Sequence, residues 1–210
     1  MSVLWTFGDS FTEAYNPKYE WSRKYIEWKG YAPKVYGEVI SDRLGYELNN
    51  KGLGGSSNQT ILETVCNCVD NIKPDDLVIV GWSSPIRFRI VDEWGEWQHM
   101  IPHMSFNFEK IANVKLESIV DILENRYHIK YSNEVESWIK LINKSLPDCK
   151  VVHWKYHTDN LNVNLITDKE NINRETKGLI NDGHFGEYGQ LELAEELIKI
   201  ITNNNRRKLI

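Results

Sequence analysis

Residues 76–80 read Asp76-Leu77-Val78-Ile79-Val80 and are uniformly apolar after the first residue. A short run of this kind is typical of a parallel strand that is covered on both faces. Similar short runs predict further strands at residues 3–7, 46–49 and 149–155. Apolar residues at helical spacing predict helices at residues 32–44, 58–72, 110–125, 133–146 and 187–202. The alternation predicts an α/β fold with a central parallel sheet between two layers of helices.

Two stretches lack a regular period. Residues 85–107 are irregular and rich in aromatic side chains, and residues 158–173 are polar and predict a loop over the domain edge. The chain has 210 residues without an internal repeat or a recognisable linker. We therefore expect a single domain over residues 1–210.

The charge composition argues against two classes of binding partner. The formal net charge is −5, which leaves no electrostatic footprint for nucleic acid or for an anionic membrane surface. No signal peptide or membrane-spanning run is recognisable, so we expect a cytoplasmic protein without membrane insertion. Association with a virion, or release by lysis, stays open. The oligomeric state does not follow from the sequence.

The three cysteines, Cys66, Cys68 and Cys149, do not form a disulfide framework or a zinc spacing. They are expected as buried small hydrophobes. His99 and His103 are four residues apart, but Pro102 between them disfavours a helix and no carboxylate completes a motif. The sequence therefore predicts neither a metal nor a cofactor.

In a doubly wound sheet, reacting groups gather at the carboxyl ends of the strands. The first predicted strand runs into Phe7-Gly8-Asp9-Ser10-Phe11-Thr12. A tight turn after a buried strand can expose the Ser10 hydroxyl and aim backbone N–H groups at the space before it. A helix N-cap is the structural alternative for this serine.

The segment Asn181-Asp182-Gly183-His184-Phe185-Gly186 stands directly before the last predicted helix. A serine hydroxyl becomes a nucleophile only if a base takes its proton, and a carboxylate commonly orients that base. Asp182 and His184 are two residues apart, so one turn can supply both groups. Ser10, Asp182 and His184 also follow a chain order known for α/β hydrolases.

Together, the Gly-Asp-Ser-Phe-Thr stretch, the glycine-rich segment Gly52-Leu53-Gly54-Gly55 and the Asp-Gly-His segment resemble the SGNH hydrolases, or GDSL esterase/lipase family. The resemblance implies a three-layer, flavodoxin-like α/β/α fold and hydrolysis of O-acyl or thioester bonds. It makes Ser10 the nucleophile, with His184 and Asp182 completing the triad. It also implies an oxyanion hole formed by the N–H groups of Ser10 and Gly55 and by a third-block asparagine side chain.

The chain departs from this family's pattern in two places. Gly81-Trp82-Ser83-Ser84 stands where the family has Gly-x-Asn-Asp, so Ser83 takes the place of the asparagine. Either Ser83 is a weaker third donor, or Asn58 or a backbone N–H substitutes for it. The family's aspartate usually lies three residues before the histidine, where this chain has Asn181. We therefore assign the orienting role to Asp182, with a Ser-His dyad as the alternative.

Candidate substrate-binding residues are Asn58, Trp82, Arg87 and Trp21. Trp21, Tyr25 and Trp28 share one face of a helix if one forms. Either they pack on the core, or they form an aromatic wall of the kind that suits sugar faces. Arg87 either grips an anionic substrate group or is a solvated edge charge.

The expected substrate is a small-molecule or glycan ester. The abundance of aromatic residues resembles carbohydrate O-acetyl esterases of this family, including phage-encoded ones. A lipid or thioester hydrolase is the rival within the family. A carbohydrate-binding or virion-structural module that lost its chemistry is the rival outside it. A nucleotide-binding domain ranks last, because the glycine-rich segment lacks a P-loop Lys-Ser/Thr.

Overall fold

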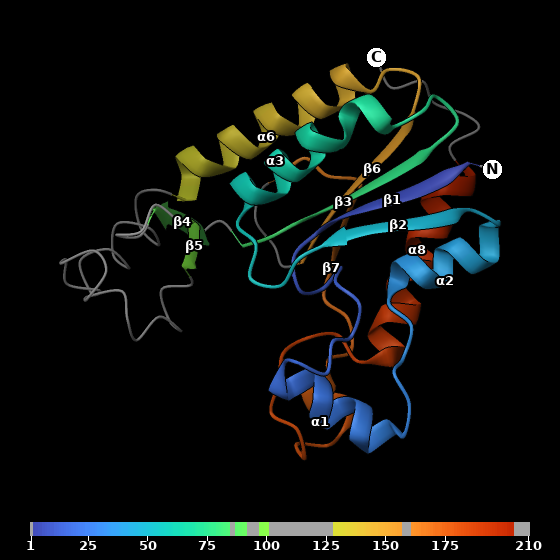
Figure 1. Ribbon diagram of the computed structural model, residues 1–210, viewed down its shortest axis with the longest axis vertical. Helices are drawn as coiled ribbons and strands as arrows, with labels where there is room; N and C mark the ends of the chain where they lie inside the picture. The colour runs from blue at the N-terminus through green and yellow to red at the C-terminus, as the bar shows by residue number, and fades with distance from the viewer. Residues whose placement is uncertain (1, 85–86, 92–96, 101–127, 157–160, 204–210) are drawn as a thin grey trace.

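The computed structural model describes residues 2–84, 87–91, 97–100, 128–156 and 161–203. Its main feature is a five-stranded sheet in the order β2-β1-β3-β6-β7, in which every neighbouring pair is parallel (Figure 1). The strands of this sheet are β1 (Val3–Gly8), β2 (Glu47–Gly52), β3 (Leu77–Trp82), β6 (Lys150–Tyr156) and β7 (Leu165–Thr167). The helices are α1 (Glu20–Lys29), α2 (Tyr36–Leu44), α3 (Asn58–Cys68), the 3-10 turn η1 (Val69–Asn71), α6 (His128–Ser145), α7 (Ile172–Glu175) and α8 (Glu187–Asn203).

The order of the strands is that of the flavodoxin-like doubly wound fold, in which the second strand of the chain lies outside the first. The chain reverses direction across the sheet between β1 and β3. This arrangement confirms the predicted parallel sheet and brings the ends of β1, β2 and β3 to one edge.

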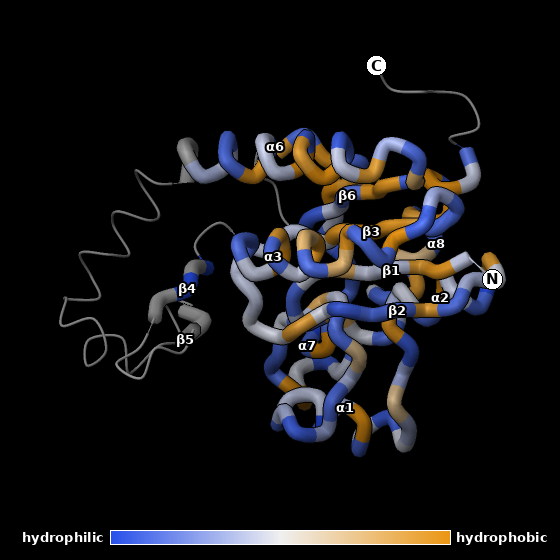
Figure 2. The backbone as a smooth tube through the Cα atoms, turned by 45° about the horizontal axis from the view of Figure 1, so that its top comes forward, coloured by the Kyte–Doolittle hydropathy of each residue, from blue (hydrophilic) through white to orange (hydrophobic). Residues whose placement is uncertain are grey.

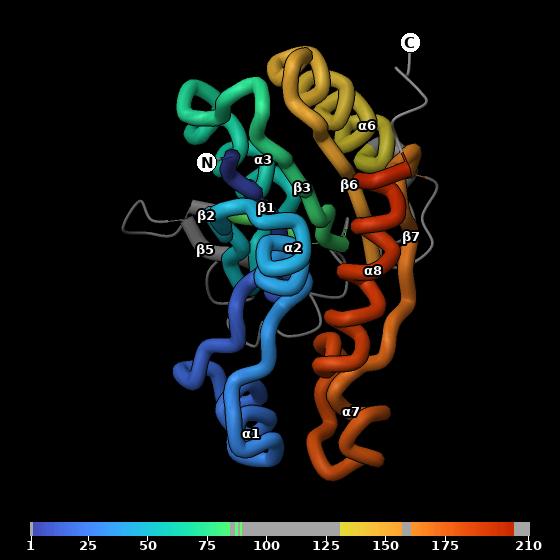
Figure 3. Tube along the Cα trace, turned by 90° about the vertical axis from the view of Figure 1, so that its right-hand side faces the viewer, coloured from blue at the N-terminus to red at the C-terminus, as the bar shows by residue number. Residues whose placement is uncertain are grey.

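Alternate residues of the central strands face opposite sides, as the period of a strand requires. One core contains Leu4, Leu77 and Ile79 with side chains of α2 and α8. The other contains Trp5, Phe7, Val78 and Val80 with side chains of α3 and α6. The helices therefore form a layer on each face, which confirms the α/β/α architecture (Figure 3). Figure 2 shows hydrophobic residues following β3 and β6 between these layers.

The edges of the sheet differ from the sequence prediction. The strand predicted at 46–49 extends as β2 to Gly52. The predicted loop at 158–173 contains β7, which pairs with the end of β6, and the start of α7. A strand of three residues is too short to show the alternation of polar and apolar side chains, so the sequence does not predict β7. The irregular stretch 85–107 contains the antiparallel pair β4 (Phe88–Val91) and β5 (Trp97–Met100). The helix predicted at 110–125 lies outside the described residues.

The helix ends follow local chemistry. α2 ends at Gly45, which has the left-handed φ of 74° that glycine adopts readily. α3 begins after Ser57, whose hydroxyl accepts the Thr60 N–H. The predicted helix 58–72 ends at Cys68 and continues only as the 3-10 turn. The expectation of buried cysteines was wrong: Cys66 is exposed, and Cys68 and Cys149 are half-buried. On α3, Ile61 and Val65 supply the buried face instead.

No helix in the described ranges is long and apolar enough to cross a membrane.

Candidate active site

Four segments meet at the carboxyl edge of the sheet: the turn after β1, the glycine-rich loop after β2, the end of β3 and the loop before α8. Leu53 donates its N–H to the Gly8 carbonyl at 3.1 Å, and the Asn50 amide donates to the Thr12 carbonyl at 2.8 Å. The Gln190 amide of α8 donates to the Phe11 carbonyl at 3.1 Å. The predicted gathering of the three sequence blocks at one edge is therefore present in the structure.

Ser10 lies on a tight turn. The N–H groups of Thr12 and Glu13 both donate to the Asp9 carbonyl, at 2.9 and 3.0 Å. Gly8 is required by close approach, because a Cβ there would lie 2.1 Å from the Thr12 hydroxyl oxygen. Ser10 itself is 9% exposed. Within the described part of the chain, its hydroxyl makes no hydrogen bond, so the proton is free for another acceptor.

The buried carboxylate of Asp9 ties this turn to the end of β3. One oxygen accepts the Phe11 N–H at 3.0 Å. The other accepts the Ser83 hydroxyl at 2.8 Å and the Arg87 guanidinium at 2.8 Å. Arg87 is therefore neither a solvated edge charge nor a free grip for an anion. Its charge is paired inside the protein.

Asn58 and Ser83 bind each other. The Ser83 N–H donates to the Asn58 side-chain oxygen at 2.7 Å, and the Asn58 amide donates back to the Ser83 carbonyl at 3.0 Å. Both residues are buried. The side-chain donors that the sequence offered for a third oxyanion contact are thus engaged within the protein, Ser83 with Asp9 and Asn58 with the backbone.

Trp82 is the last residue of β3 at this edge, but its side chain turns into the core. Its ring is buried between the sheet, α3 and α6, and its indole N–H donates to His153 Nδ1 at 3.2 Å. The indole is therefore engaged within the core rather than with substrate.

The glycine-rich loop holds Gly55 in the left-handed region, with φ of 78°. The neighbouring Gly54 donates its N–H to a Glu13 carboxylate oxygen at 2.9 Å. Partial burial raises the pKa of Glu13, while the Gly54 N–H and the Tyr19 hydroxyl act in the opposite direction. Glu13, three residues after Ser10, thus fixes the peptide that precedes the candidate oxyanion donor.

His184 and Asp182 form a local pair. His184 Nδ1 lies 2.5 Å from Asp182 Oδ1, and the same oxygen accepts the His184 backbone N–H at 2.8 Å. Because an ionised carboxylate only accepts hydrogen bonds, Nδ1 carries the proton and Nε2 keeps its lone pair. Asn181 instead accepts a bond from the Asn173 amide at 3.0 Å. Of the two positions considered from the sequence, Asp182 is the one that contacts the imidazole.

Backbone hydrogen bonds shape this loop. Ile172 donates to the His184 carbonyl at 2.8 Å, Asn173 to the Asp182 carbonyl at 3.1 Å, and Gly186 to the Glu170 carbonyl at 3.1 Å. The loop is therefore clipped against the start of α7 before α8 begins, which leaves His184 partly exposed at the sheet edge.

Two aromatic rings pack on the imidazole. Trp21 of α1 stacks face to face, with ring centroids 4.1 Å apart and planes 5° apart. The Phe11 ring lies 5.4 Å away. Since Phe11 directly follows Ser10, the histidine loop lies against the Ser10 turn.

The three aromatic residues of α1 divide between the two alternatives that the sequence left open. Tyr25 is fully buried, Trp28 is 44% exposed, and Trp21 is half-buried against His184. Asp9 and Glu13 are site-edge residues that sequence reasoning did not single out. Each gains its partner from a distant segment or from a turn, so no periodic signal points to it.

Within the described ranges, no group of three or more His, Cys, Asp or Glu side chains could hold a metal ion. The chemistry available at this edge is that of a hydroxyl, an imidazole oriented by a carboxylate, and backbone N–H groups.

No protein-family model and no curated protein matches this sequence. Similar solved structures include a member of the lipolytic protein G-D-S-L family from Veillonella parvula DSM 2008, at 13% identity and a TM-score of 0.38, covering 98% of this chain and 75% of that one. An acetylxylan esterase from Geobacillus stearothermophilus is 13% identical with a TM-score of 0.42, over 95% and 94% of the two chains. A carbohydrate esterase is 12% identical with a TM-score of 0.47, over 99% and 69%. The solved structures similar to this chain thus include G-D-S-L lipolytic proteins and carbohydrate esterases.

Proposed function

We propose that the chain is a serine esterase that hydrolyses O-acyl esters, with Ser10 as nucleophile, His184 as general base and Asp182 as the group that orients it. The observation that carries this proposal is the Asp182–His184 pair, whose 2.5 Å contact leaves Nε2 as the basic nitrogen on a loop packed against the Ser10 turn. A serine needs such a base to attack a carbonyl at neutral pH.

The reaction would proceed in two halves. His184 Nε2 takes the Ser10 proton while Ser10 Oγ attacks the acyl carbon. The alcohol leaves with the proton from His184, and the acyl group stays on Ser10. His184 then deprotonates a water molecule that attacks the acyl-enzyme, and collapse releases the acid and returns the proton to Ser10.

The oxyanion of both tetrahedral intermediates would be held by the backbone N–H groups of Ser10 and Gly55. The engagement of the Ser83 hydroxyl by Asp9 supports a structural role for Ser83 rather than a third donor. Loss of one oxyanion donor typically costs roughly 10²–10³ in kcat. A chain that relies on two donors is expected to prefer reactive esters.

We further propose a short-chain acyl ester of a carbohydrate as the substrate class. Tyr19 lies at the edge of the site, where its ring is partly exposed and its hydroxyl contacts the Glu13 carboxylate. Flat rings with polar tips match the faces of a sugar while keeping hydrogen-bonding capacity.

The direct test is Ser10→Ala against Ser137→Ala, an exposed serine of α6 that serves as the matched control. Ser10→Ala should abolish p-nitrophenyl acetate hydrolysis and covalent labelling by a fluorophosphonate probe, whereas Ser137→Ala should keep both. Unchanged activity in Ser10→Ala would overturn the nucleophile assignment.

A glycan-binding module without hydrolytic chemistry is the second candidate. Two observations favour it: serine replaces the family's third-block asparagine, and its hydroxyl is engaged by Asp9. In that case the wild-type chain itself would resist the fluorophosphonate probe, yet it would bind an immobilised polysaccharide.

A further inference from the structure

We propose that Trp21 is a positioning residue for His184: its indole fixes the plane of the imidazole, and contacts made by the rest of α1 hold the indole in place. This inference rests on the proposed role of His184 as a base. It gives Trp21 a task on the enzyme's own histidine rather than on the substrate.

The geometry of the stack supports the positioning role. The bond from Nδ1 to Asp182 holds one edge of the imidazole, and the Phe11 ring contacts it at a tilt of 38°. The Trp21 ring, 4.1 Å away and within 5° of parallel, covers a whole face of the imidazole, and so limits rotation out of this plane and directs Nε2. Trp21 is itself confined, because Tyr15 meets it edge-on at 6.0 Å and Tyr19 stacks on it at 6.4 Å.

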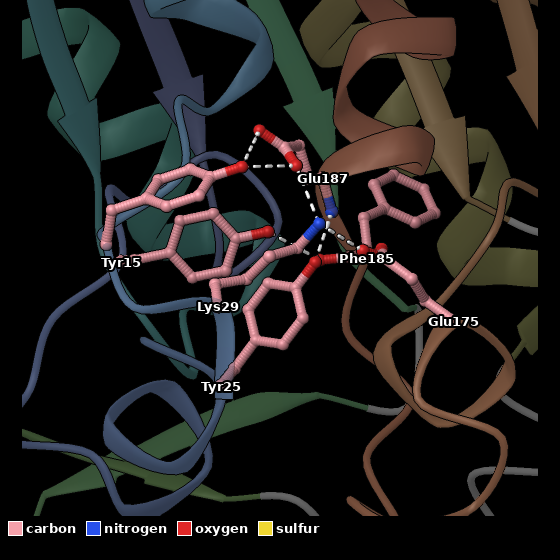
Figure 4. A network of polar contacts seen from close by, with 7 residues as sticks. Tyr15, Tyr25, Lys29, Glu175, Phe185 and Glu187 are labelled. Carbon is pink, nitrogen blue, oxygen red and sulfur yellow. Dashed lines mark hydrogen bonds and ion pairs between the residues drawn. The ribbon is translucent and has the colours of Figure 1, made fainter. Parts of the chain in front are cut away.

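The other end of α1 is clasped to the segments on either side of His184 (Figure 4). Lys29 Nζ lies 2.7 Å from a Glu175 oxygen of α7 and 2.7 Å from a Glu187 oxygen at the start of α8. The Glu187 N–H donates to the Tyr25 hydroxyl at 2.7 Å. The Lys29 and Glu175 side chains are largely buried, so this ion pair has a defined geometry. Figure 3 shows α1 and α7 together at the end of the molecule beyond the sheet.

The test measures the NMR order parameter of the His184 imidazole C–H bonds in the wild-type protein, Trp21→Leu, Trp21→Phe and Trp138→Leu. Trp21→Leu should lower the order parameter from about 0.85, the value of a rigid group, to below about 0.6, and Trp21→Phe should lower it less, because a smaller ring remains. Trp138, a half-buried tryptophan of α6 that packs on Tyr131, is the matched control and should leave it unchanged.

A folded Trp21→Leu variant whose His184 order parameter is unchanged would overturn the inference. If that variant does not fold, the same criterion applies to Trp21→Phe. In p-nitrophenyl acetate hydrolysis, kcat of Trp21→Leu should fall about tenfold at constant KM. A raised KM with unchanged kcat would instead make Trp21 a substrate wall and refute the positioning role. The order parameter is measured without substrate, so its outcome stands apart from the Ser10→Ala test of the esterase itself.

Discussion

His184 and His153 are both bound to a tryptophan, yet the structure prepares them for opposite tasks. The Asp182 carboxylate holds the proton of His184 on Nδ1, which leaves the lone pair on Nε2. In His153 the Trp82 indole N–H donates to Nδ1 at 3.2 Å, so the proton must sit on Nε2, which lies 3.1 Å from the Asn143 oxygen. The lone pair of His153 is therefore covered by a donor, whereas no donor among the described residues contacts His184 Nε2.

Burial separates the two rings further. The His184 side chain is 23% exposed on its loop, whereas His153 in the middle of β6 is 2% exposed. Burial lowers the pKa of His153 to about 4, so this ring stays neutral at physiological pH. The comparison teaches that a histidine is prepared to act as a base only when one ring nitrogen donates to an acceptor and the other is accessible. Residue type alone does not decide this.

The largest expected effect separates the two histidines in catalysis. His184→Ala should reduce kcat for p-nitrophenyl acetate by about 10⁴ or more, because the variant lacks the imidazole that takes the serine proton in the proposed mechanism. His153→Asn, which keeps an acceptor for the Trp82 N–H, should change kcat by no more than about threefold. Equal losses in the two variants would remove the distinction drawn between the rings.

The next effect concerns the acceptor that sets the tautomer. Asp182→Asn should lower kcat by about 10⁴, because an amide N–H facing Nδ1 favours the tautomer that carries its proton on Nε2. Asn181→Ala is the matched control on the neighbouring residue and should stay near wild-type activity. The reverse result would move the orienting role to position 181, where the family usually has its aspartate.

The buried His153 ring should affect the stability of the protein at acid pH rather than its activity. The unfolded chain protonates His153 near pH 6.5, but the native ring takes a proton only near pH 4. The unfolded state therefore binds more protons between these values, and stability is lost as the pH falls from about 6.5 to about 4. The loss amounts to about 3 kcal/mol. Urea unfolding across this range should show a shallower pH dependence in His153→Asn. An equally steep dependence in that variant would assign the effect to another group.

The smallest effect tests the second bond of His153. Asn143→Ala removes the acceptor for the His153 Nε2 proton at the exposed surface of α6. Water can take its place, so the free energy of unfolding should fall by about 1 kcal/mol or less, with no change in ester hydrolysis. Urea unfolding measures the first quantity and an initial-rate assay the second. A loss of several kcal/mol would show that this bond is as enclosed as the one to Trp82.

The central strands could be predicted from the sequence, whereas the edges of the sheet could not. β1, β3 and β6 are covered on both faces, so each carries an apolar run that is visible locally. β2 and β7 are the edge strands of the described sheet, so each pairs with a strand on one side only and buries fewer of its residues. The polar residues Asn49 to Gly52 of β2 and the three-residue β7 therefore gave no period, and their limits were missed.

The contacts of the candidate site also fall into those that the local sequence predicts and those that it does not. Asp182 and His184 are two residues apart, and a short loop suffices to bring them into contact, so their pairing follows from the local sequence. Ser83, Arg87 and Trp82 were considered for substrate or oxyanion contacts, but distant partners engage them. Asp9 binds the first two, and His153 binds the third.

By itself, the sequence determined the parallel sheet, the edge at which its loops gather and the pairing of Asp182 with His184. These features depend on hydrophobic period, strand direction and short loops, which act over neighbouring residues. Only the tertiary structure decided that Trp21 stacks on His184 and that Asp9 holds the Ser83 hydroxyl. Such contacts join residues far apart in the chain, and they depend on how loops and helices pack, which no local pattern encodes.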